Sequence, residues 1–264
     1  MDVPGARVLV TGASSGIGAA LARQFADRGA RVVVAARSAA VLGALADDIG
    51  GHALTVDLAD VSAVDGLVDR AGDLAGGPID ILVNNAGVAE IDLFAVRRAD
   101  TIERELQVNL GAAIALTRQA LPGMLDRGRG HLVFTSSLQA VAPTPGFAVY
   151  GATKAAIAQF AAILRLELRR TPVGITVVAP GPVDTPMWEQ VEAAPVTTGL
   201  LRRYRRVGML TKDDPVALAG AVVAAVERDA RHVRTPRRAA MLNMLNEAPR
   251  RMTELMMTGV RFDG

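Results

Sequence analysis

Cysteine is absent from this 264-residue sequence, and aromatic residues are scarce, with one tryptophan, two tyrosines and six phenylalanines. Without cysteine the chain forms no disulfide and no thiolate metal site, and a reducing compartment is consistent with that absence. The three histidines, His52, His131 and His232, lie too far apart in the sequence to suggest a metal cluster. The sequence therefore predicts no metal centre.

An excess of charge of either sign is also missing, since 29 lysines and arginines face 27 acidic residues. No basic stripe with interleaved aromatic residues occurs, so nucleic acid is not expected as a partner. The apolar runs end well before the roughly 18 residues that a membrane-spanning helix needs. No charged leader with an apolar segment follows Met1. We therefore expect a cytoplasmic protein without a membrane span.

Short β-branched runs alternate with longer helical patterns over the first 180 residues. The predicted strands are 6–11, 30–36, 52–57, 79–85, 130–136 and 174–180, and the predicted helices are 16–28, 38–49, 61–75, 99–125 and 147–171. Near-continuous Val, Ile and Leu is typical of parallel strands covered on both faces. The alternation predicts an α/β fold, a doubly wound Rossmann sheet of about seven parallel strands, as one domain over 1–264.

The alternation stops after this point. Residues 181–212 contain three prolines among Met, Trp, Leu and Tyr residues, and a long irregular segment of this kind is often a binding loop or lid. We assign 186–212 to a substrate-binding loop, whose apolar residues predict an apolar pocket. A helix is predicted over 214–230. The Arg- and Met-rich tail, 236–264, predicts a helix packed on the body or on a partner subunit, with a membrane-surface role as the alternative.

The first predicted strand leads directly into TGASSGIG, residues 11–18, and then into a helix. Gly12 permits a sharp turn, Gly16 lets the backbone approach a ligand, and Gly18 lets the helix pack closely on the strand. Because a helix N-terminus offers unpaired amide groups to an anion, the loop predicts a site for a dinucleotide pyrophosphate. A plain structural turn is the alternative, since glycine turns between strand and helix are common.

Three further strand ends carry polar residues. Ala36 occupies the position where an acidic residue would bind the ribose of NAD, and Arg37 follows it, which suits the 2′-phosphate of NADP. NADP(H) is therefore favoured and NAD stays possible, while a solvated Arg37 is the alternative. Asp57 either accepts a hydrogen bond from the adenine amino group or caps the next helix. The stretch NNAG (84–87) either holds the cofactor edge or forms a plain turn.

Tyr150 and Lys154 stand out because lysine occurs in this chain only at positions 154 and 212. On a helix, the i, i+4 spacing places both side chains on one face. A tyrosine hydroxyl ionises near pH 10. A neighbouring ammonium, helped by an oxidised nicotinamide ring, would favour the phenolate and make it a usable acid and base. Taken alone, such a pair is more often part of a solvated helix face.

The order of these motifs resembles that of the short-chain dehydrogenase/reductase family over residues 6–187. The matching pieces are TGASSGIG, NNAG, Asn109 in VNLGAA, Ser137 thirteen residues before the tyrosine, YGATK and PGPVDTPM (180–187). The resemblance implies an NAD(P)-dependent oxidoreductase that interconverts a ketone or aldehyde and an alcohol. From the lid residues we expect a small apolar substrate.

The resemblance also implies a role for each matched residue. Tyr150 would be the general acid/base and Ser137 would bind the substrate oxygen, with Ser136 as its neighbouring competitor. Lys154 would hold the nicotinamide ribose, and Asn109 would position a water that relays protons to the lysine. The implied cofactor contacts are Gly12, Ser14, Ser15, Gly16, Ile17, Gly18, Arg37, Asp57, Leu58, Asn85, Ala86, Gly87, Tyr150, Lys154, Pro180, Val183 and Thr185.

Some features leave alternatives open. Ser14 and Ser15 stand where NADP-using relatives often carry a basic residue, and the tail lacks the family's usual ending, which puts the common tetramer contacts in doubt. Helices 99–125 and 147–171 carry more apolar surface than one sheet face requires, so we expect a homodimer or homotetramer built through them. The alternatives in function are a catalytically silent dinucleotide-binding regulator or scaffold, and another Rossmann enzyme such as a methyltransferase, which would leave the Tyr-x-x-x-Lys pair unexplained.

Overall fold

One parallel sheet organises the protein. The computed structural model describes residues 1–206, 208 and 210–235, so the predicted tail helix at 236–264 lies outside the described residues. Seven strands lie in the order β3-β2-β1-β4-β5-β6-β7, and all neighbouring pairs are parallel. They are β1 (Arg7–Thr11), β2 (Arg31–Ala36), β3 (His52–Thr55), β4 (Ile81–Asn84), β5 (Gly130–Thr135), β6 (Val173–Ala179) and β7 (His232–Arg234).

The first six strands lie where the β-branched runs predicted them, and the doubly wound fold is confirmed. The seventh, β7, has only three residues, which is too short for a periodicity to be visible in the sequence. The strand order reverses between β1 and β4. The chain segments that leave the carboxyl ends of these two strands therefore run to helices on opposite faces of the sheet. In sheets of this kind a crevice opens at that reversal, and ligands bind there.

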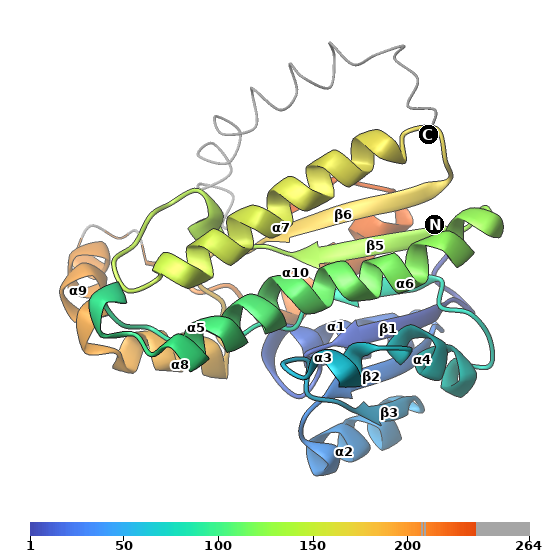
Figure 1. Cartoon of the computed structure of the whole chain (residues 1–264), viewed down its shortest axis with the longest axis horizontal. Coiled ribbons are helices and arrows are strands. Elements are labelled where there is room, and N and C mark those ends of the chain that lie inside the picture. Colours follow the sequence, from blue (N-terminus) through green and yellow to red (C-terminus); the bar gives the residue numbers. More distant parts are fainter. Residues whose placement is uncertain (207, 209, 236–264) are drawn as a thin grey trace.

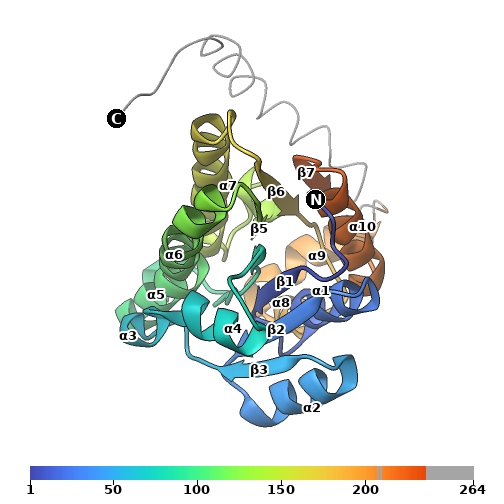
Figure 2. The same ribbon diagram turned by 90° about the vertical axis from the view of Figure 1, so that its right-hand side faces the viewer.

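Helices cover both faces of the sheet, as Figures 1 and 2 show. On one face Phe25, Leu42 and Val222 belong to the core, and on the other Leu67, Leu116 and Ile157 do. The first layer consists of α1 (Gly16–Asp27), α2 (Ala39–Ile49) and α10 (Pro215–Glu227), and the second of α4 (Leu67–Ala75), α6 (Ala112–Asp126) and α7 (Ala148–Glu167). The two cores fix the sheet between them, and no helix within the described residues is long and apolar enough to cross a membrane.

Two predicted helices are interrupted. The helix expected over 61–75 is split into α3 (Val61–Val64) and α4 by Gly66, whose φ of +64° is left-handed. The helix expected over 99–125 begins as α5 (Ala99–Leu106) and widens into a π-helical turn, η2 (Gln107–Gly111), before α6. Turns of this kind occur frequently at functional sites.

The segment 186–212 was expected to be irregular, and this expectation is wrong. It contains two helices, α8 (Pro186–Ala193) and α9 (Thr198–Arg206), which lie beyond the carboxyl ends of the strands in Figure 1. The Thr185 hydroxyl accepts a hydrogen bond from the Trp188 amide, and Pro186 occupies the first turn. A capping threonine followed by proline begins a helix, so Pro186, one of the prolines that suggested a loop, marks a helix start instead. The described residues also contain three short 3₁₀ turns: η1 (Phe94–Val96), η3 (Leu138–Ala140) and η4 (Pro195–Thr197).

Candidate active site

A cavity of about 650 Å³ opens at the carboxyl edge of the sheet, at the point where the strand order reverses. Its walls come from the turn after β1, the ends of β2, β4, β5 and β6, the first turns of α7, and the lid formed by α8 and α9. All of the predicted cofactor contacts line this cavity. Segments that are far apart in the sequence therefore meet in one site.

The glycine loop leaves room where side chains would block a ligand. Gly12 has φ +67°, and a Cβ atom there would lie 2.6 Å from the Ala86 Cα. A Cβ on Gly16 (φ +54°) would lie 2.9 Å from the Thr185 Cγ2, and one on Gly18 would collide with the Gly12 carbonyl. The plain-turn alternative does not explain three such close approaches at the mouth of a cavity.

The α1 N-terminus faces this loop with its amide groups available. Ser15, the N-cap residue, has extended backbone and makes no side-chain capping hydrogen bond. The first amides of a helix have no partner within the helix, and they carry the positive end of the helix dipole. A loop with glycines at three positions of close approach, in front of such a terminus, fits the pyrophosphate of a dinucleotide.

A threonine that the sequence analysis did not single out joins the loops after β1 and β4. The buried Thr11 hydroxyl donates to the Val83 carbonyl at 3.0 Å and accepts from the amides of Asn85 and Ala86 at 3.1 and 3.2 Å. The side-chain nitrogen Nδ2 of Asn85 donates in turn to the Thr11 carbonyl at 3.1 Å. The NNAG stretch is thus hydrogen-bonded to the loop after β1 and is not a plain turn.

Asp57 and Arg104 face each other where β3 ends. The Arg104 guanidinium lies 3.2 Å from Asp57 Oδ2, and the Ala59 amide donates to Asp57 Oδ1 at 3.0 Å. Burial alone would raise the pKa of Asp57, but these hydrogen bonds and the charge of Arg104 hold it below its usual value. The next helix, α3, is capped by Asp60 instead, so the helix-cap alternative for Asp57 is wrong. Arg37 is exposed at the cavity wall nearby.

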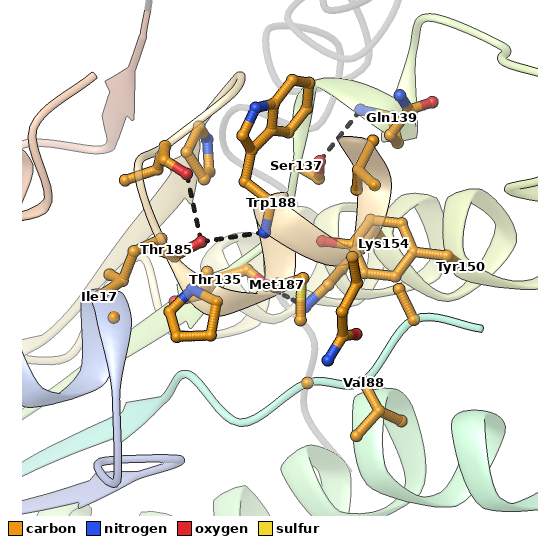
Figure 3. A pocket seen from close by; sticks show the side chains of 18 of the residues that line it. Ile17, Val88, Thr135, Ser137, Gln139, Tyr150, Lys154, Thr185, Met187 and Trp188 are labelled. Atoms are coloured by element: carbon orange, nitrogen blue, oxygen red, sulfur yellow. Dashed lines mark hydrogen bonds between the residues drawn. The ribbon is translucent and has the colours of Figure 1, made fainter. Parts of the chain in front are cut away.

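Ser137, Tyr150 and Lys154 lie together at one end of the cavity (Figure 3). Tyr150 and Lys154 are one turn apart on α7, and the Lys154 Nζ lies 5.5 Å from the centre of the Tyr150 ring. Lys154 is buried, and its ammonium donates to the Thr135 carbonyl at 2.8 Å. The solvated-face alternative for this pair is therefore wrong, because both side chains point into the site.

The two adjacent serines after β5 have different surroundings. The Ser136 hydroxyl donates to the Lys154 carbonyl at 2.8 Å, which ties the end of β5 to α7. The Ser137 oxygen accepts from the Gln139 amide at 3.2 Å and also hydrogen-bonds the Tyr150 side chain. Ser137 therefore carries the hydroxyl next to the phenol, whereas the Ser136 hydroxyl is engaged in a hydrogen bond to the backbone of α7.

Burial controls the ionisation of both α7 side chains. Desolvation raises the pKa of Tyr150 to about 12, and the Ser137 hydrogen bond opposes this only in part. Desolvation also lowers the pKa of Lys154 to about 8, although the carboxylate of Glu105 favours its charged form. The sequence predicts a lowered tyrosine pKa, and the folded protein shows the opposite shift, because the loss of hydration at Tyr150 outweighs the Ser137 hydrogen bond and the charge of Glu105 adds to the rise.

Asn109 lies behind the cavity wall in the π-helical turn. Its side-chain oxygen accepts from the Val88 amide at 2.8 Å, and its nitrogen donates to the Val88 carbonyl at 2.9 Å and to the Thr153 hydroxyl at 3.2 Å. A Cβ on Gly87 would lie 3.3 Å from the Lys154 Nζ and 3.5 Å from the Asn109 oxygen. Asn109 thus holds in place the segment after β4, at Gly87 and Val88, that lies between Asn109 and Lys154.

Some residues of the site carried no signal in the sequence. Arg104, on α5, pairs with Asp57, two residues beyond β3, through a contact between segments 47 residues apart in the sequence. Arg97 and Glu105 form a buried ion pair at 2.7 Å, and the Arg97 guanidinium also donates to the Glu90 carbonyl at 2.9 Å. Burial raises the pKa of Glu105 despite this partner. Such pairings depend on tertiary contacts between segments that the local pattern does not relate.

The sequence is similar to those of known proteins. The family model for short chain dehydrogenase matches residues 6–195. The fatty acyl-CoA reductase of Mycobacterium tuberculosis is 37% identical over 240 residues, which cover 86% of this chain and 80% of that protein. The NADP-dependent 3-hydroxy acid dehydrogenase of Salmonella typhi is 36% identical over 211 residues, covering 78% of this chain and 84% of that protein.

A solved structure agrees over nearly the whole length. The short-chain dehydrogenase from Sphingobium yanoikuyae in complex with NADPH superposes with a TM-score of 0.80 at 30% identity, covering 97% of this chain and 96% of that one. The closed form of serine dehydrogenase complexed with NADP⁺ reaches a TM-score of 0.73 at 29% identity, covering 86% and 91%. The chain is therefore an oxidoreductase of the short-chain dehydrogenase/reductase family.

Proposed function

We propose that this protein is an NADP(H)-dependent oxidoreductase that interconverts an apolar ketone or aldehyde and the corresponding secondary or primary alcohol. The observation that carries the proposal is that Ser137, Tyr150 and Lys154 meet in one cavity with the glycine loop at Gly12–Gly18. NADPH bound there would supply the hydride. A dinucleotide-binding regulator without catalysis would have no need of a phenol, a hydroxyl and an ammonium at the same end of the cavity.

In this proposal each side chain handles the substrate oxygen or a proton. Tyr150, protonated at neutral pH because burial raises its pKa to about 12, donates the proton from its hydroxyl to the carbonyl oxygen during reduction. Ser137, hydrogen-bonded to the phenol, donates to the same oxygen and stabilises the charge that develops there. Lys154 holds the ribose of the nicotinamide half, and Asn109 keeps the Val88 backbone in place beside it.

The preference for NADP(H) rests on charge at the end of β2. Arg37 is exposed at the cavity wall and follows Ala36, which has no carboxylate to repel a 2′-phosphate. Arg104, the second cation at this end, is paired with Asp57. We therefore assign the 2′-phosphate to Arg37 and the adenine edge to Asp57 and Leu58. NAD(H) would lack the Arg37 contact and bind less tightly.

The apolar substrate is assigned from the lid. The inner side of the lid carries Met187, Trp188, Leu200, Leu201 and Tyr204 into the cavity. Apolar walls with a few polar groups at one end orient a ligand by that end and tolerate an apolar remainder. The carbonyl would then lie against Tyr150 and Ser137, with its apolar substituent under α8 and α9.

The proposal is tested by a panel of apolar ketones and aldehydes incubated with NADPH that carries deuterium at the transferable position of nicotinamide C4. We expect NADPH oxidation and one deuterium on the carbinol carbon of the product alcohol, measured by mass spectrometry. Parallel assays with NADH should give a lower kcat/KM. Tight NADPH binding without turnover of any panel member would instead favour the silent regulator.

A further inference from the structure

Helix α9 has two chemically different sides. Leu200, Leu201 and Tyr204 line the cavity. The next positions around the helix, Arg202, Arg203, Arg205 and Arg206, are exposed. At 100° per residue, Arg202 and Arg206 face away from the cavity and Arg203 lies on a flank. One short helix therefore closes an apolar chamber with its inner side and presents guanidinium groups on its outer side.

The acidic residues of the lid do not neutralise these arginines. Glu192 pairs with Arg205 at 2.9 Å and with Lys212 at 3.4 Å, and Asp184 pairs with Lys212 at 3.1 Å. The three remaining arginines, 202, 203 and 206, form no ion pair within the part of the chain that the structure describes. Within the described residues, the lid thus has three arginines without an acidic partner, which we call the lid arginines, on the outer side of a helix whose inner side lines the cavity.

From this arrangement we propose that the natural substrate is an acyl thioester of coenzyme A, whose phosphates bind the lid arginines while its apolar acyl chain enters the cavity. The inference rests on the proposed carbonyl chemistry and adds the substrate class. A ligand that meets both sides of α9 must be long, apolar at one end and polyanionic at the other. Guanidinium groups bind phosphates through directed, often paired, hydrogen bonds.

The chain's own tail is a poor alternative occupant of this surface. The segment 236–264 contains five arginines against three acidic residues, so its net charge has the same sign as the lid arginines. Like charges repel at an exposed surface. An external polyanion is the better complement.

The test compares two thioesters of one medium-chain 3-oxoacyl group, one with coenzyme A and one with N-acetylcysteamine, which has the thioester but no phosphate. In both, NADPH would reduce the 3-oxo carbonyl, with hydride added to carbon and a proton to oxygen. We expect kcat/KM to be about tenfold or more higher for the coenzyme A thioester at low salt. The difference should shrink at high salt, because exposed charges are screened.

The variants Arg202→Glu, Arg203→Glu and Arg206→Glu isolate the lid arginines. Each should raise KM for the coenzyme A thioester by roughly five- to tenfold while leaving the N-acetylcysteamine thioester almost unchanged, since the repelled group is the phosphate. Arg170→Glu, an exposed arginine just beyond the far end of α7, is the matched control and should change neither value. A binding readout without turnover comes from Trp188, the only tryptophan: free coenzyme A should quench its fluorescence, and less so in the lid variants.

Several results would overturn the inference. Equal kcat/KM for the two thioesters would remove the phosphate contact but leave the proposed oxidoreductase intact. Turnover of neither thioester nor any other carbonyl would remove both. Acceptance of the acyl group on a carrier protein with rejection of the coenzyme A thioester would assign the arginines to a protein partner. Arginine-dependent sedimentation with vesicles of anionic phospholipid, without a thioester preference, would assign them to a membrane surface.

Discussion

At the scale of single residues, the environment of Tyr150 sets the chemistry. Burial raises the pKa of Tyr150 to about 12, so the phenol is protonated at neutral pH and is a poor base there. Lowering that value to 7 would require about 7 kcal/mol. Lys154 cannot supply all of this, because its ammonium is directed to the Thr135 carbonyl and its own pKa is lowered to about 8. Under the proposed function, we therefore expect alcohol oxidation to depend on the positive charge of the oxidised nicotinamide.

The two pKa values predict different pH dependences for the two directions. For carbonyl reduction, kcat/KM should be level at neutral pH and fall above about pH 8, since Lys154 is charged below its lowered pKa and neutral above it. For alcohol oxidation, kcat/KM should rise with pH, since the phenolate is the active form. Initial rates between pH 6 and 10 measure both profiles. Lys154→Arg should be slower but should lose the decline near pH 8, because arginine stays charged there; an unchanged decline would contradict the assignment to Lys154.

At the scale of elements, the start of α1 packs so closely against the neighbouring loops that Gly18 has no room for a side chain. A Cβ on Gly18 would lie 2.6 Å from the Asn85 side-chain nitrogen and collide with the Gly12 carbonyl, so this helix start touches both loops of the crevice. On the other side of the sheet, the π-helical turn η2 also contacts a loop of the crevice. Asn109 lies in this turn, and its side-chain oxygen accepts a hydrogen bond from the Val88 amide.

This packing predicts opposite outcomes for two glycine-to-alanine substitutions. Gly18→Ala should lower the free energy of unfolding by about 1–3 kcal/mol through overpacking and weaken NADPH binding. Gly43→Ala, in the middle of α2 with no atom within 4 Å of the added Cβ, should raise it by about 0.5–1 kcal/mol, because alanine is the better helix former. Urea denaturation and NADPH fluorescence titration measure the two effects. Equal stability of the two variants would contradict the close contact at Gly18.

At the scale of the whole molecule, α5, α6 and α7 lie together on one flank, as Figure 2 shows, and they expose apolar side chains. Leu106 is 42% exposed, Ile114 and Leu125 are each 38% exposed, and Ile163 is 48% exposed. We propose that this flank pairs with its copy in a homodimer or homotetramer.

Sedimentation tests this proposal against a protomer mass of 27.5 kDa. We expect at least twice that mass for the wild type. Ile163→Glu should shift the population toward the monomer, because a charge would be buried in the interface. Val216→Glu, at a valine that is 53% exposed on α10 on the opposite face of the sheet, should leave the mass unchanged. A monomeric wild type would rule the assembly out.

Much of this organisation could be read from the sequence, because parallel strands buried on both faces leave unbroken runs of Val, Ile and Leu. The glycine loop and the Tyr150–Lys154 spacing could also be read from the sequence, because local backbone geometry sets both of them. The two lid helices could not, because prolines such as Pro186 fit both loops and helix starts and the two helices are only 8 and 9 residues long. The partners of Asp57 and Glu105, and the direction of the Tyr150 pKa shift, depend on contacts and burial that exist only in the folded chain.

The central claim, that the Tyr150 hydroxyl supplies the proton for carbonyl reduction, is tested most directly by Tyr150→Phe, assayed for NADPH affinity and for kcat on one accepted carbonyl. Tyr204→Phe, the same change at the chain's other tyrosine, is the matched comparison. The account predicts that Tyr150→Phe binds NADPH with a Kd near that of the wild type and loses about 10²–10⁴-fold in kcat, while Tyr204→Phe loses far less. A Tyr150→Phe enzyme that turned over at the wild-type rate would contradict the account.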